Sequence, residues 1–281
     1  MLYEGLREES GHKVNDAKYS FIRDECFTDL RHFRDDLETA FLYYCHPGPA
    51  TISEVIPSLS LQHRDTLLKW AAFKGSQMLL IDGCYDQSGS TMSNWTTDLV
   101  LEIMSSAQYS MRQSNMESSV ALVAHFCHPR RDAKAGREEI VVQDFLRQLF
   151  ETKRRHFEDY NEYGTSGLTK ATLRDIANKP ERLWALFAHS VLEAGIRTLI
   201  IALENVDAMY RHSQPAIGSQ SHNSNTNCLQ KLVPNMQKHL QVLQDRNVTV
   251  KTIVTSRDSR AASYFLGLQP ITIELRKPPE R

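Results

Sequence analysis

The chain has 281 residues, of which 41% are hydrophobic and 24% are charged, and its formal net charge is -1. This composition is typical of a globular protein with one large or two small domains, and it lacks the basic excess expected of a nucleic-acid-binding protein. The five cysteines include no Cys-x-x-Cys pair, which argues against a disulfide framework or a zinc knuckle and favours a reducing, cytoplasmic location.

Residues 1–57 are predicted to form a helical N-terminal region. The first residues, Met1 to Glu9, are too charged for a secretory leader, and no apolar run in the chain reaches membrane-spanning length. From Tyr19 to Tyr44, apolar residues recur at helical spacing opposite a polar face that carries both charge signs. We expect this helix to pack on the following domain or on a second copy of the chain, rather than on a membrane.

Residues 58–276 have the alternating pattern of an α/β domain. A helix is predicted from His63 to Phe73, and a short buried strand from Gln77 to Ile81. A loop of glycines and hydroxyls, Asp82 to Ser90, leads into a helix from Thr91 to Ser110. Strand, glycine-bearing loop and helix are the context that a phosphate-binding loop requires.

The middle of the chain predicts a second strand and three helices. The strand from Ser119 to Cys127 is almost continuously apolar, which is typical of strands buried on both faces of a parallel sheet. Helices are then expected from Glu138 to Phe157, from Thr169 to Ala177, and from Pro180 to a stop at Gly195.

Two acidic residues end the third predicted strand, which begins at Arg197. Glu204 follows the apolar run and Asp207 comes three residues later. A carboxylate at this end of a buried parallel strand lies where open α/β sheets bind ligands, and it is suited to hold Mg²⁺. The alternative is that both residues simply begin a loop.

The last part of the chain adds a helix and two strands. Residues His212 to Asn227 are polar and of low complexity, which predicts a mobile surface loop. A helix is expected from Cys228 to Asp245, a strand from Val248 to Arg257 and a β-like stretch from Pro270 to Leu275, before a tail at 277–281.

The loop after the first strand departs from the phosphate-binding pattern in two ways. A P-loop reads Gly-x-x-x-x-Gly-Lys-[Ser/Thr], in which backbone amides and the lysine hold the phosphates and the hydroxyl ligates Mg²⁺. Here five residues rather than four separate Gly83 from Gly89, and Ser90 stands where the lysine is expected.

Other chemistry receives less support from the sequence. His125 and Cys127 share one face of a strand while His128 points to the other, so a strand end is favoured over a metal site. Cys45 and His46 are adjacent, but no orienting carboxylate accompanies them, and Gly-x-Ser-x-Gly is absent.

Four segments, taken in order, carry a resemblance: Leu79 to Thr91, Val120 to Phe126, Leu199 to Asp207, and Thr252 to Arg257. Together they resemble the NTPase domain of the STAND class, most closely the NACHT-like, nephrocystin-3 N-terminal-type domains abundant in fungal proteins. A tryptophan-bearing helix before the loop, at Leu67 to Trp70, is similar too. The resemblance spans Ser58 to Leu275 and implies a P-loop NTPase-like, three-layer α/β/α fold with a mainly parallel sheet.

The resemblance also implies a site for Mg-ATP or Mg-GTP. Gly83, Gly89 and Ser90 would line the phosphates, Thr91 would ligate Mg²⁺, and Arg257 would sense the γ-phosphate. Replacement of the lysine by Ser90 removes the charge that compensates the triphosphate, so we expect weak binding.

On the acidic side, Glu204 would take the place of the family's usual metal-binding aspartate, and Asp207 would match the second acidic residue and is a candidate catalytic group. Ala208 stands where the family often has the glutamate that positions water, so we expect no efficient hydrolysis.

Two functions therefore remain open. The preferred one is a degenerate NTPase domain that acts as a regulatory or protein-interaction module, with protein partners or self-association and no nucleic acid or membrane partner. The alternative is a slow ATPase or GTPase with an atypical phosphate loop. Because the chain stops where relatives would continue into a winged-helix module and a repeat array, we expect a stand-alone remnant or a truncated form.

Overall fold

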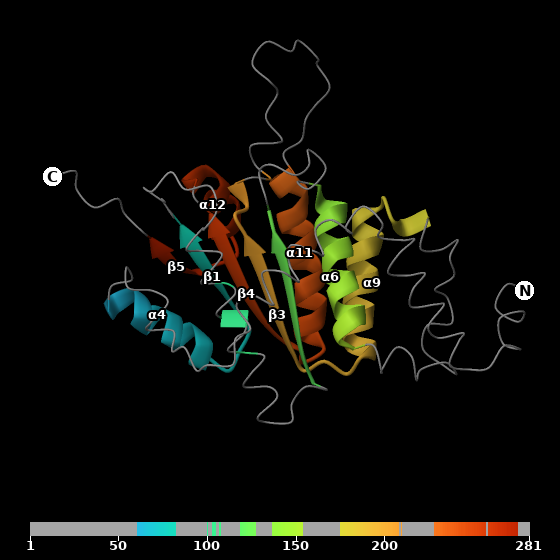
Figure 1. Cartoon of the computed structure of the whole chain (residues 1–281), viewed down its shortest axis with the longest axis horizontal. Coiled ribbons are helices and arrows are strands. Elements are labelled where there is room, and N and C mark those ends of the chain that lie inside the picture. Colours follow the sequence, from blue (N-terminus) through green and yellow to red (C-terminus); the bar gives the residue numbers. More distant parts are fainter. Residues whose placement is uncertain are drawn as a thin grey trace, which may run out of the picture.

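The computed structural model describes residues 61–82, 100, 103–104, 107, 119–127, 137–153, 175–207, 209, 228–256 and 258–274 (Figure 1). Its five strands form one parallel sheet in the order β2-β3-β4-β1-β5. They are β1 (Gln77–Asp82), β2 (Val120–Phe126), β3 (Thr198–Glu204), β4 (Thr249–Ser256) and β5 (Ile271–Glu274). The predicted α/β class with a parallel sheet is confirmed, whereas the predicted N-terminal helical region lies outside the described residues.

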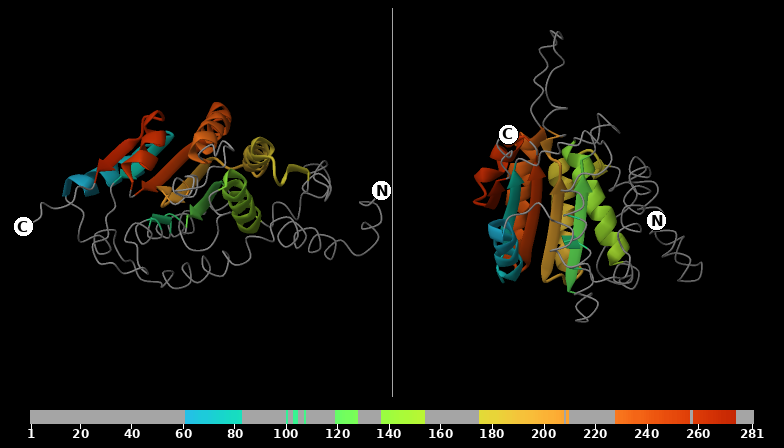
Figure 2. Two further views of the ribbon diagram at one scale, coloured as in Figure 1. Left: turned by 90° about the horizontal axis from the view of Figure 1, so that it is seen from above. Right: turned by 60° about the vertical axis from the view of Figure 1, so that its left-hand side comes forward.

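Both faces of the sheet are covered, as the apolar strands predicted. One face packs against α6 (Glu138–Thr152), α9 (Pro180–Glu193), α11 (Cys228–Asp245) and α12 (Ser259–Leu266). The other face packs against α4 (Leu61–Ala72) and the helical residues Val100 and Met104 (Figure 2). Successive residues of β1 serve opposite faces: Leu80 belongs to the first layer and Leu79 to the second, and each is fully buried.

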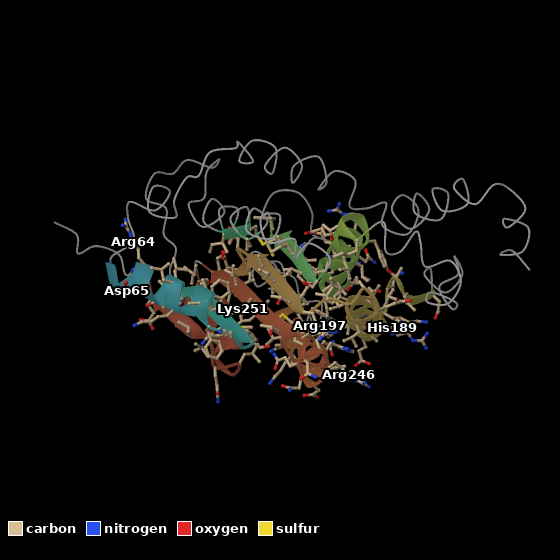
Figure 3. All side chains as sticks on the ribbon, turned by 90° about the horizontal axis from the view of Figure 1, so that it is seen from below. Arg64, Asp65, His189, Arg197, Arg246 and Lys251 are labelled. Atoms are coloured by element: carbon tan, nitrogen blue, oxygen red, sulfur yellow. The ribbon has the colours of Figure 1, made fainter. Side chains whose placement is uncertain are left out.

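Helix α4 is attached to the sheet by a buried lysine as well as by apolar contacts. Lys251 of β4 lies beside α4 (Figure 3). Its ammonium donates a hydrogen bond to the Trp70 carbonyl at 2.7 Å and lies 5.4 Å from the centre of the Trp70 ring and 5.2 Å from that of Phe73. The Trp70 indole donates to the Gln77 carbonyl at 3.2 Å. Burial lowers the pKa of Lys251, so the ammonium is held at a cost in hydration that these contacts offset.

Two elements differ from the sequence-based expectation. Helix α6 ends at Thr152 and not at Phe157, because Lys153 leaves helical geometry with φ -108° and ψ 26°. Helix α12 was not expected at all, although Asp258 is a typical N-cap whose carboxylate accepts from the Arg260 amide at 3.0 Å. Its shortness, between two strands, hid it from a search for helical periodicity.

Other boundaries agree closely with the predictions. Helix α9 begins at Pro180 and is followed by Gly195 at φ 66°, a left-handed position that suits glycine. Helix α11 has the predicted bounds. The helices predicted at 91–110 and 169–177 are described only in part, and the 212–227 insertion and the tail lie outside the described residues.

Candidate functional site

The connection that leaves β1 runs across the sheet in the opposite direction to the connections that leave β2, β3 and β4. From β1 the chain passes β4 and β3 to reach β2, returns to β3 and β4, and then passes β1 to reach β5. Right-handed crossovers place the first connection on one face and the later ones on the other, which matches Val100 and Met104 facing α6, α11 and α12 across the sheet. Open α/β sheets bind ligands outside the carboxyl ends of strands at such a switch point. The ends of β1 and β4 are therefore the candidate site.

Registered pairing brings several strand ends to the same edge. Asp82 at the end of β1 pairs with Ser256 of β4 and Glu274 of β5, and Glu204 at the end of β3 pairs with Phe126 of β2. These strand ends and the residues directly after them form what we call the carboxyl edge. Most of its described residues are polar, and Glu204, Asn205 and Ser256 among them are buried.

The structure describes part of the predicted site. Glu204 is the last residue of β3 and only 4% exposed, and Asp207, 2% exposed, opens a helical turn three residues later. The prediction that both acids lie at the end of a buried parallel strand is confirmed, while their roles stay predictions. The predicted phosphate-side residues lie outside the described part of the chain: Gly83, Gly89, Ser90, Thr91 and Arg257.

The thiol of Cys127 is buried at the carboxyl edge. Burial raises the pKa of Cys127 well above its ordinary value, and the negative charges of Glu204, Asp207 and Asp144 raise it further. The thiol is therefore protonated at neutral pH and unsuited to act as a nucleophile. Three carboxylates therefore contribute to the electrostatic surroundings of Cys127, and one of them, Asp144, is paired with Arg147.

The acidic side chains of Glu204 and Asp207 are better suited to a cation than to a bare phosphate. Carboxylate and amide oxygens are the ligands that Mg²⁺ and Ca²⁺ prefer, so Glu204, Asp207 and the amide of Asn205 fit the metal that the resemblance implies. Within the described ranges, however, no three His, Cys, Asp or Glu side chains are grouped so that they alone could hold a metal. A cation here would need further oxygens from a ligand or from another part of the chain.

The histidine that the sequence singled out belongs to a buried ionic network instead. His125 Nδ1 lies 3.2 Å from Asp144 Oδ2, and Arg147 donates to Asp144 Oδ1 at 2.9 Å. Burial opposes ionisation of Asp144, but the hydrogen bond from His125 and the charge of Arg147 outweigh it and lower the pKa of this carboxyl. His125 therefore links β2 to α6, while His128 lies outside the described residues.

A second buried acid joins three helices. The Glu138 carboxylate accepts from the Trp184 indole at 2.9 Å and from the Asn235 amide at 2.9 Å. Burial raises the pKa of Glu138, and burial together with Glu138 and Glu139 raises the pKa of Cys228 to about 12. Neither described thiol, then, is a thiolate at neutral pH.

Sequence reasoning missed the residues that hold the carboxyl edge together. Asn205 and Thr255 bond to each other there, and Asp144 pairs with His125 from a different element. The available signal was Asn205 itself, since asparagine directly after a strand is a common left-handed residue. The partners are 50 and 19 residues apart in the chain, so spacing alone did not reveal them.

A scan against models of protein families found no match to this sequence, and a search of curated proteins found no relative. Among the described helices, none combines the length and the apolar character needed to cross a bilayer.

Proposed function

We propose that the chain is a degenerate STAND, NACHT-like NTPase domain that serves as a regulatory or protein-interaction module with weak or absent nucleotide binding. The observation that carries the proposal is that the connection leaving β1 runs opposite to those leaving the other strands. Open α/β sheets bind ligands at the carboxyl end of such a strand, and in the sequence the glycine-bearing segment follows Asp82 directly. The order of motifs that carries the resemblance points to the same place.

Weak binding follows from the charges at this position. Ser90 takes the place of the phosphate-binding lysine, and the loss of such a charge-assisted hydrogen bond costs roughly 1.5–3 kcal/mol, or about 10- to 150-fold in affinity. The carboxylates of Glu204 and Asp207 add negative charge at the end of β3, two strands away from β1, so a triphosphate would be repelled unless a divalent cation came with it.

The melting temperature with and without Mg-ATP and Mg-GTP tests the proposal. At about 1 mM nucleotide we expect a shift below about 1 °C, because stabilisation depends on the ratio of ligand concentration to Kd. A shift of several degrees would overturn the weak-binding proposal and establish a working nucleotide site.

Ser90→Lys tests whether the loop still has phosphate-binding geometry. If it does, the restored lysine should raise affinity for Mg-ATP by at least about tenfold. Ser88→Lys is the matched control, since it adds the same charge two residues earlier in the loop. Equal gains in both variants would indicate only general electrostatic attraction, and no gain in either would mean that the extra residue between Gly83 and Gly89 has disrupted the cradle.

The alternative function, slow ATP or GTP hydrolysis, is favoured by one specific observation. Glu204 and Asp207 lie together at the carboxyl edge, where Glu204 would bind Mg²⁺ and Asp207 would act near the reacting water. If purified protein releases phosphate, Asp207→Asn should abolish that release while leaving nucleotide affinity nearly unchanged. Release that persists in Asp207→Asn would come from a contaminating enzyme or from a different group.

Partners and location follow from the same proposal. A domain of this type that does not hydrolyse nucleotide would act by binding other proteins or further copies of itself, in the cytoplasm. Size-exclusion chromatography with light scattering, across a range of concentrations, measures self-association directly.

A further inference from the structure

The sheet formed by the described strands has β2 and β5 on its outside, and these two strands differ in sequence. An outer strand offers backbone donors and acceptors to other chains, and proteins limit such pairing with short strands, prolines and charges. Strand β5 has four residues, follows Pro270 and ends at Glu274. Strand β2 has seven residues and contains no proline, glycine, aspartate, glutamate, lysine or arginine. The sequence of β2 therefore lacks the protection that β5 has.

Alternate residues of β2 direct their backbone groups away from β3. The Cys127 amide, directly after β2, donates to the Glu204 carbonyl of β3 at 3.0 Å. Backbone groups of successive residues in a strand point to opposite sides, so those of Ala124, three residues earlier, point away from β3. We call this the outer side of β2, because none of the described strands pairs with it.

A side chain of α6 binds both backbone groups of Ala124 on the outer side. The Ala124 amide donates to Gln148 Oε1 at 2.8 Å, and Gln148 Nε2 donates to the Ala124 carbonyl at 2.6 Å. A glutamine side-chain amide has the same donor and acceptor as a peptide group, so Gln148 contacts Ala124 as a residue of a neighbouring strand would. Helix α6, which packs against β2, holds Gln148 in this place (Figure 2).

We propose that Gln148 caps the outer side of β2 and thereby prevents a second copy of the chain from pairing its own β2 there. The second copy is the partner that fits, because an apolar segment of this length without charge or proline pairs readily with an identical segment. Two antiparallel β2 strands about a two-fold axis would satisfy the backbone groups of both copies. The inference goes beyond the proposed function, since no residue of the nucleotide site takes part.

Gln148→Met tests the proposal, because methionine has a similar length but makes neither hydrogen bond. Size-exclusion chromatography with light scattering, over a range of concentrations, measures the result. At high concentration the mass of the variant should reach about twice that of the wild type at the same concentration. Equal masses for the variant and the wild type at every concentration would overturn the proposal.

Gln143→Met is the matched control on the same helix. Gln143 is 6% exposed and donates to the Ala177 carbonyl at 2.6 Å, so its replacement also removes a buried hydrogen bond, but one that lies away from β2. This variant should lose melting temperature and keep the mass of the wild type. If both methionine variants associate in proportion to their loss of melting temperature, association follows from destabilisation and the proposal is overturned.

Gln148→Glu separates the loss of stability from the opening of the strand. At about pH 8 the glutamate is ionised. It can still accept from the Ala124 amide, but it places an oxygen against the Ala124 carbonyl, so the melting temperature should fall. A charge beside an outer strand opposes pairing, so the mass should stay that of the wild type. Association as strong as in Gln148→Met would refute the capping role.

Hydrogen exchange measured by mass spectrometry locates the contact. In dilute Gln148→Met, amides of the Val120–Phe126 peptide should exchange faster than in the wild type, because Ala124 has lost its acceptor. In concentrated samples the exchange should slow again as two β2 strands pair. Fast exchange at every concentration would mean that Gln148 only stabilises its own fold. Self-association of the wild type through another surface would change exchange in other peptides, so this inference and the proposed function can fail separately.

Discussion

Replacement of Lys251 by methionine should loosen helix α4. The variant lacks the ammonium and so loses its charge-assisted hydrogen bond to the Trp70 carbonyl, worth roughly 1.5–3 kcal/mol. It also loses the two cation–π contacts with the Trp70 and Phe73 rings, worth about 0.5–1 kcal/mol each. Methionine returns about 0.3–1.5 kcal/mol through sulfur–aromatic contacts and removes the hydration cost of a buried ammonium. The expected net loss is about 1–3 kcal/mol.

Thermal unfolding measures this loss. For a domain of roughly 150–250 residues, each kcal/mol corresponds to a shift of about 2–4 °C, so the melting temperature should fall by about 2–12 °C. Lys69→Met is the control, because Lys69 is an exposed residue of the same helix and its replacement should stay within about 0.5 kcal/mol of the wild type. A Lys251→Met stability equal to that of the control would refute the reasoning.

The pH dependence of the stability difference between the wild type and Lys251→Met tests the direction of the Lys251 pKa shift. Because burial lowers the pKa of Lys251, the unfolded chain binds more protons than the folded one between that lowered pKa and the ordinary value. The stability of the wild type relative to Lys251→Met should therefore rise with pH through this window. A difference that falls with rising pH would show that the folded protein favours the charged form.

Three further predictions concern two buried acids and a pair of exposed glycines. Asp144→Asn should cost about 3–5 kcal/mol in urea unfolding, since a buried charge loses its partner. Because the pKa of Asp144 is lowered in the folded protein, its carboxylate adds to the free energy of unfolding above the ordinary pKa, and this stabilisation is lost as pH falls through the lowered pKa. The Asp144→Asn variant should therefore lose less stability in acid than the wild type. Gly195→Ala should lower the free energy of unfolding by about 1–2 kcal/mol, because φ is 66° there, although there is open space around the added carbon. Gly267→Ala, with equal space but φ -61°, should raise the free energy of unfolding by about 0.4–1 kcal/mol. Glu138→Gln should lower the pKa of Cys228 from about 12, as measured by alkylation against pH; an unchanged profile would mean that burial alone sets it.

Local patterns in the sequence predicted most of the described elements. The strands were found because buried parallel strands are nearly continuous in apolar residues, as in Thr198–Glu204. The bounds of α11 and the stop after α9 followed from helical periodicity and from glycine at a left-handed position. Helix α12 was missed because it is short, and α6 was drawn too long because apolar periodicity does not show that Lys153 leaves helical geometry.

The candidate site was predictable only in part. The sequence placed Glu204 and Asp207 at the end of a strand, because that position needs only one segment to be recognised. It contained no sign that Asn205 would bond to Thr255, or Lys251 to Trp70, because those residues lie 50 and 181 positions apart.

By itself the sequence determined the class of fold, the segments that form strands and the acidic character of the strand end at Glu204. Only the tertiary structure decided the order of the strands, and with it the opposite direction of the connection leaving β1 that makes the ends of β1 and β4 the candidate site. The physical reason is that secondary structure depends on patterns within one segment, whereas strand order and buried pairs such as His125 with Asp144 depend on contacts between segments distant in the chain.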